Sequence, residues 1–166
     1  FLLISAITEP RTGSVLINGI PTSNIQVNSL RKHIATCLKQ DHLIYGSVLD
    51  NLTMGRDISN NEVVMLCEHI GLSPLILNLQ DGYETILNPE AGALNRSMVT
   101  LILIARALLS KPLLLLWDTH YQHLTATQQT KVFDYMKNHC ACTFVLSATA
   151  DHLKDKVSKV FLLTDQ

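Results

Sequence analysis

The chain has 166 residues, and its composition is that of one folded domain. Apolar residues make up 47% and charged residues 16%, which excludes a disordered chain. The formal net charge is −1, so no strong field predicts a nucleic-acid partner or a lipid surface. The longest apolar stretch, residues 100–117, is interrupted by Arg106, Lys111 and Pro112 and is not expected to span a bilayer. The first residue is Phe1 and not Met, which indicates a processed product or a piece of a longer protein.

The first part of the chain is predicted to form two strands. The first covers residues 14–18, with turns at Gly13 and Gly19. A short helical turn at residues 29–32 comes next. The second strand, residues 33–39, is mostly apolar and ends at Gln40.

The middle of the chain is predicted to be helical. A short helix covers residues 47–52. Ser59 and Glu62 have the spacing of a capping box and open a second helix, which Gly71 closes. Ser73 and Pro74 are expected to cap and start a third helix.

The last part alternates between helices and strands. A buried helix is predicted over residues 97–109, an apolar strand over 113–117 and a helix over 127–137. A strand at 143–147, a short helix near Asp151 and a last strand at 157–163 complete the prediction. This alternation predicts an α/β fold with a parallel sheet, into which the helical residues 43–100 are inserted.

Two polar residues come directly after predicted strands, where the working residues of open α/β sheets lie. Asp118 comes directly after four leucines and a tryptophan. It is predicted either as a magnesium ligand beside nucleotide phosphates or as a turn or helix-capping residue, and its position alone does not separate the two. Gln40 is the second candidate, although a glutamine at a strand end is more often a loop residue.

No phosphate-binding loop is present in the sequence. Such a loop needs the pattern Gly-x-x-x-x-Gly-Lys-Ser/Thr, whose backbone amides and lysine hold phosphates. None of the seven glycines is followed by lysine.

The four cysteines are predicted to be reduced thiols. They are Cys37, Cys67, Cys140 and Cys142. His139 precedes Cys140, but the spacing does not favour a zinc site.

The order of these segments resembles the nucleotide-binding domain of an ABC exporter, beginning after its phosphate-binding loop. Residues 9–19 are similar to the family's EPTSGSILIDG segment, residues 29–35 to LRRxIA, and residues 40–51 to the Q-loop and the segment after it. Residues 82–85 match GYET, residues 102–108 match the helix after the signature loop, and residues 111–118 are similar to Walker B. The amino-acid sequences of residues 82–85, 102–108 and 123–124 most resemble those of peptide and bacteriocin exporters of the type I secretion kind, which carry a peptidase domain.

The resemblance also shows departures at the nucleotide site. The signature Leu-Ser-Gly-Gly-Gln falls on Leu94, Asn95, Arg96, Ser97 and Met98, so side chains replace both glycines. Asn95 and Ser97 are still expected to cap the next helix.

Three further family positions carry threonine. The catalytic glutamate falls on Thr119, the D-loop aspartate on Thr125, and the switch histidine on Thr149, or on Ala148 in a shifted register. His152 is interpreted as a surface residue. Only Gln40 and Asp118 match the family's nucleotide-site residues, and these losses predict relaxed selection or a dedicated non-catalytic role.

The resemblance implies a partial RecA-like P-loop NTPase sheet domain with an inserted helical subdomain. Residues 1–42 and 101–166 would form the sheet domain, and residues 43–100 the helical subdomain with the degenerate signature loop. ATP and Mg²⁺ are the implied ligands, with Asp118 as a vestigial magnesium site. The implied partners are a membrane-spanning exporter domain and a second nucleotide-binding domain, at the cytoplasmic face of the plasma membrane.

Three functions remain open at this point. The first is a hydrolysis-deficient ATP-binding domain that couples to a membrane domain for peptide or protein export. The second is the ATP-binding half of an active asymmetric ATPase, with its phosphate-binding loop upstream of Phe1. The third is a remnant or interaction protein without a transport role. A sheet that lacks the upstream strand is also expected to leave exposed edges, which would make the isolated chain poorly soluble.

Overall fold

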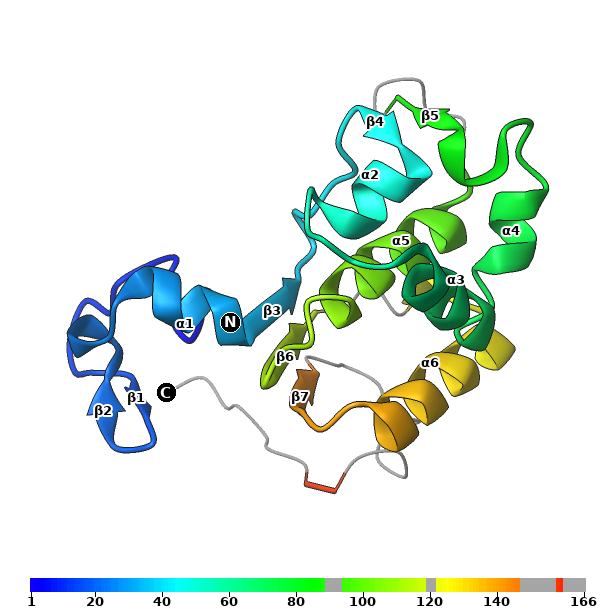
Figure 1. The fold of residues 1–166 in the computed structure, drawn as a ribbon. Helices are drawn as coiled ribbons and strands as arrows, with labels where there is room; N and C mark the ends of the chain where they lie inside the picture. Colours follow the sequence, from blue (N-terminus) through cyan, green and yellow to red (C-terminus); the bar gives the residue numbers. More distant parts are fainter. Residues whose placement is uncertain (89–93, 119–121, 147–157, 160–166) are drawn as a thin grey trace.

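The structure is a computed structural model that describes residues 1–88, 94–118, 122–146 and 158–159. Strands and helices alternate in its last part, from residue 86 to residue 146 (Figure 1). In chain order the elements are β1 (Leu16–Ile17), β2 (Ile20–Pro21), η1 (Thr22–Asn24), α1 (Val27–His33), β3 (Ile34–Cys37), β4 (Gly46–Ser47), α2 (Val48–Thr53), α3 (Asn60–His69), α4 (Ser73–Leu77), η2 (Gly82–Glu84), β5 (Ile86–Leu87), α5 (Arg96–Leu108), β6 (Leu114–Trp117), α6 (Ala126–His139) and β7 (Thr143–Leu146).

The central sheet has the order β3-β6-β7, and its strands are parallel. Trp117 lies opposite Cys37 on one side and Leu146 on the other, so the carboxyl ends of all three strands meet at one edge. These are the strands predicted at residues 33–39, 113–117 and 143–147. The first is shorter than predicted, because α1 extends through His33 and a turn begins at Leu38.

The core lies between the sheet and the helices. Figure 1 shows α3, α5 and α6 gathered on one side of the sheet. Helix α5 is buried on nearly every side, as its apolar sequence predicts, and contacts β3 and α2. Helix α6 reaches β6 through Phe133, whose ring centre lies 5.8 Å from that of the fully buried Trp117.

The residues before β3 form a small lobe beside the sheet (Figure 1). Its hairpin β1–β2 turns at Asn18 and Gly19, whose φ angles are 51° and 80°. Positive φ at both central residues is the geometry of a tight hairpin, for which Asn-Gly is the preferred pair. The predicted strand at residues 14–18 is therefore present in part, but it pairs with a second strand that was not predicted. The hydrophobic core cluster begins at Ala35, so this lobe contributes nothing to it.

Two details of helix capping differ from prediction. The Ser59 hydroxyl accepts from the Glu62 amide, but the Glu62 carboxylate pairs with Lys111 at 2.8 Å and so does not close a capping box. Ser73 is the first residue of α4 and not its cap. Its hydroxyl is instead hydrogen-bonded to that of Tyr83, at 3.1 Å.

The strand predicted at 157–163 and the helix predicted near residue 151 lie outside the described residues, apart from 158–159.

One predicted helix has stronger capping than its sequence first indicates. Ser47 and Asp50 form a complete capping box at the start of α2. The hydroxyl of Ser47 accepts from the Asp50 amide at 2.9 Å, and the Asp50 carboxylate accepts from the Ser47 amide at 2.8 Å. These bonds lower the pKa of the Asp50 carboxyl. Strand β4, which ends at Ser47, pairs antiparallel with β5, and this small sheet was not predicted.

Candidate functional site

The two strand-end residues predicted for nucleotide chemistry lie at the same edge of the sheet. Asp118 directly follows β6, and its amide donates to the Cys37 carbonyl on β3 at 2.9 Å. Gln40 follows β3 on an exposed turn. That turn is closed by Asp41, whose carboxylate accepts from the Leu38 amide at 2.7 Å. Because β3 and β6 are adjacent and parallel, both candidates follow their strands at one edge.

The electrostatics of Cys37 show which charged groups surround this edge. Burial raises the pKa of the Cys37 thiol to about 12, and the carboxylates of Asp41 and Asp118 also raise it. The Arg106 guanidinium acts in the opposite direction. Two carboxylates and one guanidinium therefore lie within electrostatic range of the last residue of β3. The carboxylate oxygens of Asp41 and Asp118 are of the type that Mg²⁺ prefers as ligands.

Arg106 on α5 holds the segment that comes after Gln40. Its guanidinium donates to the carbonyl of His42 at 3.0 Å, and to the carbonyl and the side-chain oxygen of Asn51 at 2.8 and 2.9 Å. Burial lowers the pKa of Arg106, and Asp41 acts against that shift. Helix α5 is therefore fixed to residues 42–51 by charged hydrogen bonds.

Asn51 completes this connection from inside the core. Its side chain is fully buried and uses both its acceptor and its donors. The oxygen accepts from the Ile44 amide at 2.8 Å as well as from Arg106. The nitrogen donates to the carbonyls of Ile44 and Ser47 at 3.0 and 2.9 Å. A fully satisfied polar group of this kind sets one geometry for the segment after the turn.

The segment predicted as the signature loop forms the beginning of α5. Asn95 caps this helix by accepting from the Ser97 amide at 2.9 Å, as predicted. Ser97 does not cap it, because its hydroxyl donates to the Gln128 side chain on α6 at 2.8 Å. Ser97 and Met98 are buried, and Arg96 is exposed. Of these positions, Ser97 and Met98 therefore contribute to packing inside the protein, whereas the Arg96 side chain faces solvent.

Thr125, at the predicted D-loop aspartate position, caps α6. Its hydroxyl accepts from the Gln128 amide at 3.3 Å, and its amide donates to the Gln128 side chain at 2.9 Å. This is a complete capping box. Since Gln128 also accepts from Ser97, the starts of α5 and α6 are joined through one side chain.

Several predicted positions lie outside the described residues. They are Thr119, at the glutamate position, Thr149 and Ala148, at the histidine position, and His152. Leu94 is described and is partly buried against the core.

Sequence reasoning missed Asp41, Asn51, Arg106 and Gln128 as organising residues. A signal existed for Arg106, because a cation within an otherwise apolar buried helix must find partners. No comparable signal identified its partners in the sequence. No helix among the described residues is long and apolar enough to cross a membrane.

Comparison with known proteins identifies the family. The ABC transporter family matches residues 1–121. The chain belongs to the ABC transporter family. It is 31% identical over 118 residues to the leptomycin B resistance protein pmd1 of Schizosaccharomyces pombe, a match that covers 70% of this chain and 9% of that protein. It is 26% identical over 167 residues to YfiB of Bacillus subtilis, an uncharacterized ABC transporter ATP-binding protein, and this match covers 99% of the chain and 29% of that protein.

The fold is also that of a solved member of the family. A bacterial Atm1-family ABC exporter with ATP bound matches with a TM-score of 0.79 and 23% identity, over 87% of this chain and 26% of that one. The predicted α/β class and the partial RecA-like P-loop NTPase fold are thereby confirmed. The chain spans less than a third of the length of each of these proteins.

Proposed function

We propose that this chain is the ATP-binding domain, or part of it, of an ABC exporter that hydrolyses ATP poorly and works mainly by coupling to a membrane domain. The observation that carries the proposal is the contrast between two regions. Gln40 and Asp118 are retained at the carboxyl ends of adjacent strands, whereas Ser97 and Thr125 serve helix contacts and capping. The family relationship supports ATP and Mg²⁺ as the ligands.

In this proposal Asp118 would hold Mg²⁺, and Gln40 would sense the metal and the terminal phosphate. Asp118 offers a carboxylate and Gln40 an amide oxygen, which are ligand types that Mg²⁺ accepts. When bound, the metal would neutralise charge on the phosphates. Arg106 and Asn51 would act indirectly, by fixing the segment that comes after Gln40.

Weak hydrolysis is proposed because of Thr119 and the signature segment. A threonine at position 119 cannot accept a proton from the attacking water, and a positioned general base is worth about 10²–10⁴-fold in rate. Arg96 is exposed at the start of α5, where the family's glycines allow close approach to a partner's ATP. Its long side chain would stand in that approach.

The proposed domain organisation and partners follow the family. Residues 1–42 and 101–166 would form the ATPase sheet domain, and residues 43–100 the helical subdomain that contacts a membrane domain. Helix α5 is continuous across position 100, so the second boundary would fall within a rigid element. A second nucleotide-binding domain would complete the dimer at the cytoplasmic face of the plasma membrane. Peptide or bacteriocin cargo remains a prediction from the resemblance.

The test is restoration of the general base in the intact transporter polypeptide that contains this chain. We expect Thr119→Glu to raise the rate of ATP hydrolysis by about 10²-fold or more, since a general base supplies at least that factor. Thr119→Gln is the matched control, because it has the same size but no basic oxygen pair, and it should leave the rate unchanged.

Three other outcomes would each contradict the proposal. Equal rates for the two variants, with ATP binding intact and with Arg96→Gly also present in both, would show that position 119 does not limit hydrolysis. Rapid hydrolysis by the unmodified protein would favour an active asymmetric ATPase. Failure of a fluorescent ATP analogue to bind would favour a protein without a transport role.

A further inference from the structure

Two histidines from different helices lie side by side. His69 is the last residue of α3, and His139 is the last residue of α6. Their ring centres are 5.0 Å apart. Tyr135 stacks on His139 with ring centres 4.7 Å apart and lies 5.6 Å from His69. The pair therefore spans the contact between α3 and α6, supported by one aromatic ring.

In both histidines the same ring nitrogen, Nδ1, contacts a backbone carbonyl. Nδ1 of His69 lies 2.7 Å from the carbonyl oxygen of Met65, and Nδ1 of His139 lies 3.3 Å from that of Tyr135. A carbonyl oxygen can only accept, so in each ring Nδ1 carries the hydrogen and donates it. The lone pair is then on Nε2 in both neutral rings. Histidines that bind metals are commonly oriented in this way, with the other nitrogen donating to a carbonyl.

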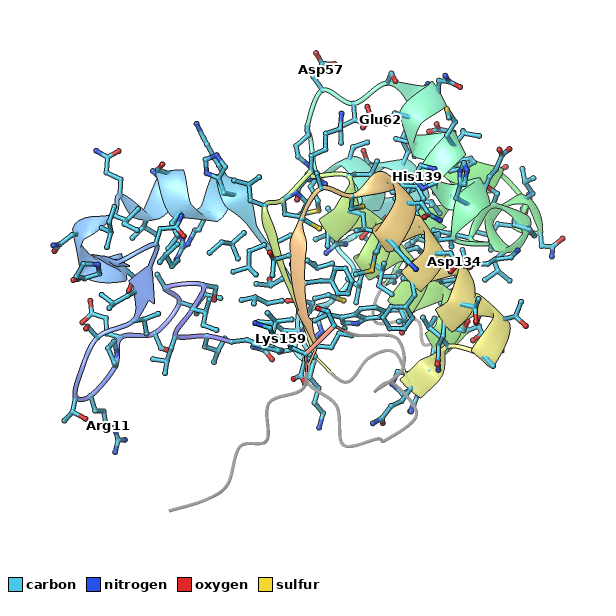
Figure 2. All side chains as sticks on the ribbon, turned by 90° about the horizontal axis from the view of Figure 1, so that it is seen from below. Arg11, Asp57, Glu62, Asp134, His139 and Lys159 are labelled. Carbon is cyan, nitrogen blue, oxygen red and sulfur yellow. The ribbon has the colours of Figure 1, made fainter. Side chains whose placement is uncertain are left out.

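The two rings line one cavity of about 300 Å³. Its wall also includes Glu62 and Met65 from α3 and Tyr135 from α6. Figure 2 labels Glu62 and His139 in this region, and Asp134 nearer the start of α6. The Glu62 carboxylate is held by Lys111 at 2.8 Å. Within residues 1–88, 94–118, 122–146 and 158–159, no group of three or more His, Cys, Asp or Glu side chains could hold a metal.

We propose that His69 and His139 together bind one divalent transition-metal ion of the zinc class through Nε2, with water in the remaining positions. Imidazole is a preferred ligand for such ions. Zn–N bonds of about 2.0–2.1 Å at a tetrahedral angle place two ring centres about 5 Å apart. The observed ring spacing fits that value. The ion would link α3, in the helical segment, to α6, after the Asp118 strand end, and does not depend on ATP binding.

The proposal is tested by titrating the full-length protein with Zn²⁺ alone in a calorimeter. We expect one equivalent to bind and the melting temperature to rise, because the ion binds only the folded arrangement. His69→Asn and His139→Asn should each weaken binding more than about 10-fold, since even the loss of a group that only orients a ligand costs about 10–100-fold.

The chain offers a matched control in His33. It ends α1 and is exposed, and its Nδ1 lies 2.9 Å from the Ser29 carbonyl, but it does not line the cavity that His69 and His139 share. His33→Asn should leave Zn²⁺ affinity unchanged. The double variant Cys140→Ser, Cys142→Ser should also bind as the unmodified protein does, because the thiols are not the proposed ligands.

A measurement on the unmodified protein covers the case of a variant that does not fold. In long-range ¹H–¹⁵N spectra, Zn²⁺ should shift the Nε2 resonances of His69 and His139 together and leave that of His33 unmoved. No binding to the unmodified protein, binding that survives loss of either histidine, or binding lost only with the cysteines would each overturn the proposal.

Discussion

Asn51 is expected to be the most sensitive polar position in the described part of the chain. Asn51→Ala removes the acceptor for Arg106 and for the Ile44 amide, and the donor to the carbonyls of Ile44 and Ser47. Ile44 is 40% exposed, so water can replace its partners. Ser47 is buried and Arg106 is half-buried, and each loses a bond that water does not readily replace.

The expected loss is set by these two groups. Each buried polar group left without a partner costs about 1–3 kcal/mol. The Arg106 guanidinium keeps two of its three bonds, which favours the lower end of that range for it. We therefore expect Asn51→Ala to reduce the free energy of unfolding by about 2–4 kcal/mol, a large part of the 5–15 kcal/mol typical of a domain.

The assay is urea unfolding of the full-length protein followed by circular dichroism. Asn78→Ala is the control, because Asn78 is an exposed residue at the end of α4 and surface changes usually stay within about 0.5 kcal/mol. A double-mutant cycle with Arg106→Met should return a coupling energy of about 0.5–3 kcal/mol. A loss below about 1 kcal/mol for Asn51→Ala, or no coupling to Arg106, would refute the reasoning, because the Ser47 carbonyl and the Arg106 guanidinium would each have lost a hydrogen bond at almost no cost.

Three further predictions concern the helix starts and the buried thiols. Ser97→Ala should cost about 1 kcal/mol in urea unfolding, because one hydrogen bond is lost while Gln128 keeps Thr125 as a donor. Thr125→Ala should also cost about 1 kcal/mol by the same assay, through loss of the α6 cap. Burial raises the pKa of Cys37 and of Cys67 to about 12, whereas an unfolded thiol ionises near about 8.5. Above that pH the unfolded state binds fewer protons, so stability should fall as pH rises towards 12, by about 1.4 kcal/mol per unit for each thiol. Cys37→Ala should flatten that fall.

The parts of the fold that could be predicted are those set by local apolar pattern. Strand β6 and helix α5 are continuous apolar segments, and each was located to within a residue or two. Asp118 could be placed at a strand end because it directly follows such a segment. The hairpin β1–β2 could also have been found, since Asn18-Gly19 is a strong turn signal between two apolar pairs.

The parts that could not be predicted depend on contacts between distant residues. Arg106 binds the carbonyl of His42, and no sequence pattern links an arginine in one helix to a backbone carbonyl 64 positions away. Capping illustrates the same limit. Ser59 and Glu62 have capping-box spacing, but Lys111 binds the carboxylate instead. A motif therefore predicts a bond only while no better partner lies nearby in the fold.

The polar contacts at the starts of α5 and α6 explain how the site and the fold can change independently. Ser97 lies in the predicted signature segment and Thr125 at the predicted D-loop aspartate, and both hydroxyls are hydrogen-bonded through Gln128. If the glycine and aspartate of the family stood at these two positions, the Ser97 bond would be absent and the α6 cap would depend on a carboxylate. The side chains present at both positions thus contribute to helix packing and to capping. Under the proposed function, in which Arg96 and Thr119 both slow hydrolysis, the rate gained on Thr119→Glu should depend on Arg96. With Arg96→Gly added, we expect a further rise in ATP hydrolysis, and no change in the free energy of unfolding beyond the roughly 1 kcal/mol that glycine costs in a helix.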